Sequence, residues 1–172
     1  MSPAARNRLC LSLFLSLLFL PLSPPFGGTA FASTETVTTT VAAGADDAKE
    51  RASDGQVVLT DVTLRPGTGN TIAFRFAGVA IPQGAVVKSA NLRMYVKDDG
   101  NRTLAVTYKA EAADSSAAFG AAAHDLSSRP KTTASVSDTP AAWTNLTWAE
   151  SPDLTAVVRE VFDRSGWASG NA

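Results

Sequence analysis

The sequence predicts a mainly β protein: an antiparallel β-sandwich of the jelly-roll type, with one amphipathic crossover helix near the C-terminus. Three observations support this fold class. Apolar residues alternate with polar ones over several short segments, turn-forming residues separate these segments, and one segment alone has the spacing of an amphipathic helix. Alternation buries one face of a strand and leaves the other in water, which is typical of antiparallel sheets.

The clearest strands lie in the middle of the chain. Thr71–Phe76, Asn91–Lys97 and Thr103–Ala110 alternate between apolar and polar residues. Asp98-Asp99-Gly100-Asn101, between the second and third of these segments, consists of residues that tolerate a positive φ. We therefore predict that Asn91–Lys97 and Thr103–Ala110 pair as a hairpin.

The flanking segments give weaker signals. Residues 33–40 are Thr-rich and polar, and they form either a linker or a weakly paired first strand. Ser115–Arg129 is rich in Ala and Ser and is predicted to be a long connection. Thr132–Ser137 and Ala141–Trp148 are two further candidate strands.

One helix is predicted near the C-terminus. Ser151 suits the N-cap, Pro152 the first helical position, and Asp153 complements the positive end of the helix dipole. Arg164 and Gly166 mark the end of the helix. Five apolar residues share one face: Leu154, Val157, Val158, Val161 and Phe162.

Residues 1–32 have the features of a cleavable signal peptide. Arg6 and Arg8 precede an apolar run over Leu9–Leu22, and Ala30-Phe31-Ala32 is a small-x-small cleavage signal before Ser33. Prolines interrupt the run, which is too short to span a hydrocarbon core of about 30 Å. We predict a secreted protein, extracellular or periplasmic, with no stable membrane insertion after cleavage. An uncleaved anchor is the alternative.

Cleavage leaves 140 residues, with the domain proper over residues 41–172. The leader carries two of the 15 basic residues and none of the 16 acidic ones, so the mature chain has a net charge of −3. This charge gives no indication of nucleic-acid binding. Cys10 is removed with the leader, so no disulfide is expected.

Several segments together resemble a known kind of module. Val79–Val96, "VAIPQGAVVKSANLRMYV", has an Ile-Pro-x-Gly turn followed by a Leu-Arg-x-Tyr strand, in which Ala90, Leu92 and Met94 are expected in the core. This segment resembles secreted bacterial β-sandwich modules of the disaggregatase-related (DNRLRE) type. With "AAGADDAKERASDGQVVLT", "PAAWT" and "SPDLTAVVREVFDRSGWASGNA", the similarity extends over residues 41–172. The resemblance implies a non-catalytic module related to carbohydrate-binding jelly rolls of large extracellular proteins.

The resemblance also implies a missing strand. In such modules the stretch similar to "GWASGNA" leads directly into another apolar strand, whereas this sequence ends at Ala172. We expect a sandwich truncated at its C-terminus, with unpaired backbone groups at the exposed edge. Such a product is either unstable alone or completed by a strand donated by a partner. The alternative is a fragment of a longer secreted protein.

Catalysis is not expected. The mature chain has one histidine, His124, and no cysteine, which removes His/Cys metal sites and cysteine nucleophiles. His124 and Asp125 are neighbours in the sequence, whereas a base and the residue that orients it must face each other. His124 is expected at the surface.

An acidic segment is the candidate metal site. Four carboxylates fall within nine residues: Asp46, Asp47, Glu50 and Asp54. Oxygen ligands concentrated in a loop suit a structural Ca²⁺ ion. Lys49 and Arg51 are interleaved with them and could instead pair with the acids in a solvated loop. No cofactor is required under either interpretation.

Aromatic residues provide the candidate ligand site: Tyr95, with Arg93 on the same outward face of its strand, and Trp143. Trp143 and Trp148 are an odd number of residues apart, so on one regular strand they face opposite ways and one of them fills the core. Trp167 is expected to pack against the helix end. The sequence therefore predicts a module that binds a polysaccharide or a cell-surface component. The alternatives are a structural or adhesion spacer, and an enzyme.

Overall fold

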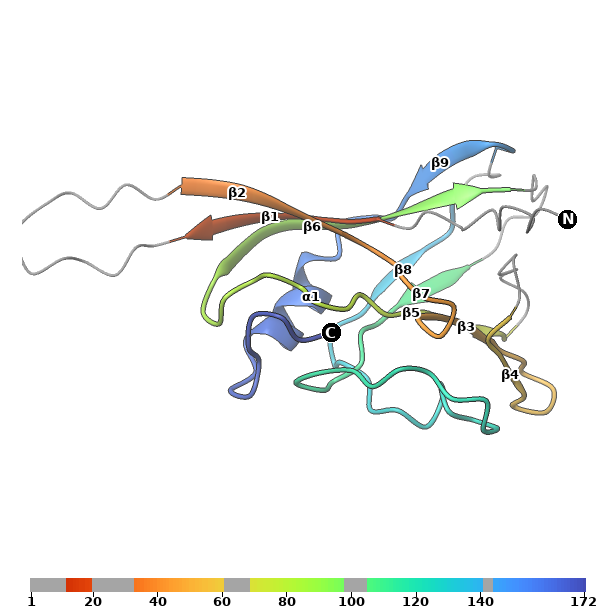
Figure 1. Ribbon diagram of the computed structural model, residues 1–172. Helices are drawn as coiled ribbons and strands as arrows, with labels where there is room; N and C mark the ends of the chain where they lie inside the picture. The colour runs from red at the N-terminus through yellow and green to blue at the C-terminus, as the bar shows by residue number, and fades with distance from the viewer. Residues whose placement is uncertain (1–11, 20–32, 61–68, 98–104, 141–143) are drawn as a thin grey trace, which may run out of the picture.

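The structure is a computed structural model that describes residues 33–60, 69–97, 105–140 and 144–172, together with the backbone of 12–19. The chain is mainly β, with small antiparallel sheets and one short helix near the C-terminus (Figure 1). The elements are β1 (Ser12–Phe19), β2 (Ser33–Thr40), β3 (Asp47–Glu50), β4 (Val57–Val58), β5 (Thr71–Phe74), β6 (Val86–Val96), β7 (Val106–Tyr108), β8 (Val136–Asp138), β9 (Thr147–Glu150) and α1 (Thr155–Phe162).

The strands form three sheets, with orders β2-β1-β6-β9, β4-β3-β5 and β7-β8. The four-stranded sheet lies along the top of Figure 1, with α1 and the smaller sheets below it. The mainly β, antiparallel part of the predicted fold class is confirmed. Over the described residues these sheets do not close into a sandwich or jelly roll.

The predicted hairpin is wrong. β6 pairs with β1 on one edge and β9 on the other, whereas β7 pairs with β8 in a separate sheet. A turn-forming sequence tolerates a change of direction, but it does not decide whether the next strand returns to the same sheet. The turn itself, Asp98-Asp99-Gly100-Asn101, lies outside the described residues.

Strand β6 contains an irregularity that sets which of its residues are buried. Ser16 pairs with Ser89 but Leu17 pairs with Val87, so Lys88 is an extra residue on β6. Val87 and Ala90 are consequently both buried although they are three residues apart. Beyond the bulge the predicted alternation is confirmed, since Ala90 and Leu92 are buried and Met94 packs partly buried against the core.

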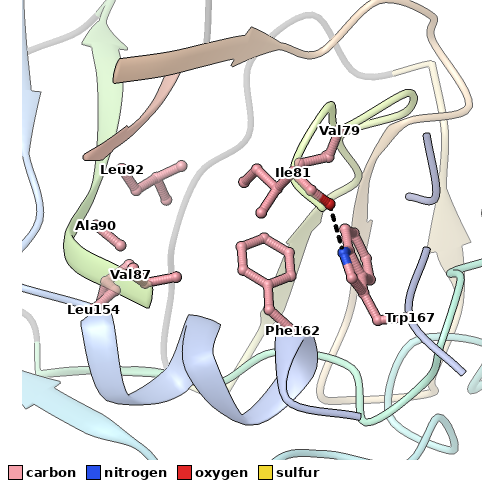
Figure 2. Close-up of a cluster of buried hydrophobic side chains, with 8 residues drawn as sticks. All are labelled: Val79, Ile81, Val87, Ala90, Leu92, Leu154, Phe162 and Trp167. Atoms are coloured by element: carbon pink, nitrogen blue, oxygen red, sulfur yellow. Dashed lines mark hydrogen bonds between the residues drawn. The ribbon is translucent and has the colours of Figure 1, made fainter. Parts of the chain in front are cut away.

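The main core lies between β6 and α1 (Figure 2). α1 begins later than predicted: Leu154 occupies the N-cap position, and Ser151 bonds instead to β6, where its Oγ accepts from the Leu92 N–H at 2.9 Å. The Asp153 carboxylate, near this end of the helix, accepts the N–H of Thr155 at 2.9 Å. Eight buried residues form the core cluster: Val79, Ile81, Val87, Ala90, Leu92, Leu154, Phe162 and Trp167.

Trp167 fixes the end of the helix against a loop, as predicted. Its ring lies 4.4 Å from that of Phe162, and its Nε1–H donates to the Ile81 carbonyl at 2.9 Å (Figure 2). Only 3% of Trp167 is exposed. This buried indole therefore satisfies its one polar group while it fills the core.

β1 belongs to the predicted leader. Its residues 12–19 lie between β2 and β6 in the large sheet. β2 covers Ser33–Thr40, so the strand alternative holds for that segment. Over the described residues, no helix is both long enough and apolar enough to cross a membrane.

Replacing Trp167 with Phe should lower the free energy of unfolding by about 1–3 kcal/mol, because the Ile81 carbonyl then stays buried without its donor. Urea denaturation of the full chain measures this change. Trp148→Phe, at an indole that is 41% exposed, is the matched control and should change stability by less than about 0.5 kcal/mol. Equal losses in the two variants would contradict the role given to Trp167.

Candidate functional site

An aromatic pair, in which Trp148 is exposed and Tyr95 is half-buried, lies across β6 and β9. Tyr95 pairs with Trp148 in the strand register, and their ring centroids are 5.4 Å apart at an interplanar angle of 67°. The guanidinium carbon of Arg93 lies 5.2 Å from the centre of the Trp148 ring. These three side chains form what we call the aromatic surface.

The alternation of β6 explains why these residues share a face. Leu92 and Val96 are buried, and the alternation of the strand turns Arg93 and Tyr95 to the opposite face, away from the core. Antiparallel pairing places directly opposite residues on the same side of the sheet, which brings Trp148 beside Tyr95. Edge-to-face ring packing and the guanidinium hold the indole in place while 41% of Trp148 stays exposed.

The structure brings two of the predicted ligand residues together and adds a third. Tyr95 and Arg93 lie on one surface as predicted, whereas Trp143 lies outside the described residues. The sequence set Trp148 against Trp143 as facing opposite ways, and Trp143 was chosen for the ligand site; the position of Trp148 beside Tyr95 depends on the pairing of β6 with β9. Once that register is known, the shared face follows.

Three of the four acidic residues proposed as calcium ligands, Asp46, Glu50 and Asp54, have separate partners. Asp46 accepts from Arg75 Nη1 at 2.7 Å, and Asp54 accepts from Arg51 Nη2 at 2.6 Å. The segment is also not a loop throughout, because Asp47 to Glu50 form β3. Burial, and then the neighbouring Asp46, raise the pKa of Asp47. No group of three or more His, Cys, Asp or Glu residues in the described ranges could hold a metal ion.

Glu50 is a buried structural acid. Its Oε2 accepts the backbone N–H groups of Leu126 and Ser127, each at 2.9 Å. Burial acts to raise the pKa of Glu50, but the hydrogen bonds from Ser127 and Leu126 outweigh it, and the pKa lies below its usual value. The carboxylate thereby ties β3 to residues 126–127.

His124 does not form a catalytic triad with its acidic and hydroxyl neighbours. Its Nδ1 lies 3.8 Å from Glu50 Oε1 and 3.5 Å from Ser127 Oγ, so both groups approach the same ring nitrogen. A proton relay needs the acid and the nucleophile on opposite nitrogens. The His124 side chain is 65% exposed, as expected, and its ring lies where a Cβ of Gly55 would be.

Arg129 anchors the long 115–129 connection. Its guanidinium bonds to Glu111 and Asp125, each at 3.0 Å, and lies 4.8 Å from the centre of the Phe119 ring. It also donates to the Ala117 and Ala118 carbonyls. Its donors are directed into the protein, so this cluster holds the connection in place.

None of the protein-family models, curated proteins or solved structures compared with the chain matches it.

Glu50→Gln should lower the free energy of unfolding at neutral pH by about 1–3 kcal/mol, because two backbone N–H groups lose a charged acceptor. Folding lowers the pKa of Glu50, so its contribution is full above the ordinary Glu pKa and is lost as the pH falls through the lowered value. Denaturation across an acid series should therefore show the variant and the wild type converging. Asp54→Asn, at an exposed acid, is the control and should cost much less. A gap that persists into acid would contradict this role.

The melting temperature of the full chain should be the same in calcium and in EDTA, because Asp46, Glu50 and Asp54 are each directed to different partners. Differential scanning calorimetry measures it. A rise in calcium that disappears in Asp46→Asn would restore the predicted metal site.

Proposed function

We propose that the chain is a secreted, non-catalytic module that binds carbohydrate on a polysaccharide or cell surface through Arg93, Tyr95 and Trp148. The observation that carries this proposal is the packing of the half-buried Tyr95 ring against the exposed Trp148 ring, with a guanidinium over the indole. A sugar ring has an apolar face that stacks on an aromatic ring, and hydroxyl groups that bond to nearby charged and polar groups. The aromatic surface offers both kinds of contact within one small area.

The proposed architecture is a two-layer β-sandwich of the jelly-roll type. Two features support it: consecutive strands β6 and β7 belong to different sheets, and α1 packs on the buried face of β6. The resemblance of residues 41–172 to DNRLRE-type modules points the same way. Cleavage of the proposed leader would leave a mature chain without cysteine and with a net charge of −3.

The test is binding of the protein to a glycan array and to insoluble polysaccharides. Tyr95→Ala and Trp148→Ala should each weaken binding about tenfold or more, because each removes a stacking surface worth about 1.4 kcal/mol or more. Affinity is measured by isothermal titration, with melting curves to show that the variants are folded.

Leu146→Ala is the matched control, since Leu146 is exposed next to β9 but offers no flat ring. It should bind as the wild type does. If the protein binds none of the glycans, the alternative of a structural or adhesion spacer is favoured. If Trp148→Ala binds as the wild type does, the aromatic surface is not the binding site.

A further inference from the structure

We propose that the space occupied by β1, between β2 and β6, accepts a β-strand donated by a separate partner protein once the leader has been cut before Ser33. We call this space the strand slot. β1 is antiparallel to both neighbours and lies between them in the sheet (Figure 1). The proposal requires leader cleavage but does not depend on sugar binding at the aromatic surface.

The first support is backbone pairing. β1 pairs with β2 from Ser12↔Thr40 to Phe19↔Ser33, and with β6 from Ser12↔Arg93 to Leu18↔Val86. Among the described strands β2 has no other neighbour. Loss of residues 1–32 would therefore leave β2 unpaired and one edge of β6 open, and an open edge is a template for a new strand.

The second support is that the other edge of β6 is already covered. The Leu92 N–H donates to Ser151 Oγ at 2.9 Å, and the Ala90 carbonyl accepts from the Leu154 N–H at 2.7 Å. Backbone groups of successive strand residues point alternately to opposite edges, so those of Asn91 and Arg93 point into the strand slot. A new strand can therefore add to β6 only at the strand slot along this stretch.

The third support is the side-chain pattern that the strand slot requires. Val87, Ala90 and Leu92 are buried on the core face of β6. The residues of β1 in register with them are leucines at positions 17, 15 and 13. The extra residue at Lys88 fixes this alignment. The occupant is thus an extended segment of about eight residues, without proline, whose alternate residues are apolar.

This pattern favours a partner protein over a second copy of the chain. The strand that cleavage frees is β2, and in it Glu35 and Thr39 share the parity of Val37. β2 of another copy would therefore bring a charge and a hydroxyl to the core face of the strand slot. The remaining described strands β3 to β9 already have partners within their own sheets.

The experiment starts from the folded full chain with a specific protease site placed within residues 20–32. After cutting, we expect the β1 fragment to stay bound and a labelled peptide of residues 10–20 to exchange into its place. Hydrogen exchange gives the position: when the fragment is removed, the Asn91 amide should lose protection while the Leu92 amide, held by Ser151, keeps it.

Two peptides of equal charge test the register. A peptide with Leu13→Asp and Leu15→Asp should fail to enter, because those positions are in register with the buried Leu92 and Ala90, whereas one with Phe14→Asp and Ser16→Asp should enter. Equal entry of both peptides, or an Asn91 amide that stays protected without the fragment, would overturn the proposal.

Two further outcomes are decisive. If the fragment-free chain unfolds and the wild-type peptide restores it, the proposal is supported; unfolding that the peptide does not reverse counts against it. If the fragment-free chain forms a dimer in which the Asn91 amide is protected, the occupant of the strand slot is a second copy of the chain and the proposed partner protein is wrong. Glycan binding is measured on the same samples, so failure of one proposal is distinguishable from failure of the other.

Discussion

Strand β6 has to satisfy the backbone groups of two edges while one of its faces covers the core. On one edge, β9 and the segment that follows it supply hydrogen bonds, continued by Ser151 and Leu154 after the strand has ended. On the other edge β1 is the one described strand that does so. Packing of α1 and exposure of the aromatic surface both follow from this one strand, because each depends on which way its residues point.

The acidic residues around β3 show that carboxylates close together in the sequence can each have a different structural partner. Glu50 holds two backbone N–H groups, and Asp46 is paired with Arg75. The long connection after β7 has little regular structure, so its backbone polar groups need side chains as partners. Glu50 accepts hydrogen bonds from backbone N–H groups of this connection, and Arg129 donates hydrogen bonds to its carbonyl groups.

The sequence pattern predicts which face of a strand is buried better than it predicts which strands pair with one another. The alternation around Leu92 correctly predicted the buried and exposed sides of β6, because a period of two follows from strand geometry alone. The hairpin was wrong because strand pairing depends on the rest of the sheet. For the same reason Tyr95 and Arg93 could be chosen from sequence, while Trp148 could not. Pairing of Arg51 with Asp54 was the local alternative that the sequence offered, whereas the partners of Asp46 and Glu50 could not be predicted, since Arg75 and residues 126–127 are distant in the chain.

Gly55 and His124 behave as a single unit. Gly55 has a φ of 69°, its carbonyl accepts the His124 N–H at 2.9 Å, and the imidazole fills the volume that a side chain at position 55 would need. A larger residue at 55 would have to displace the ring and adopt an unfavourable backbone conformation as well. A side chain at position 55 therefore requires the exposed His124 ring to leave its present position, either by a change of rotamer or by replacement with a smaller residue.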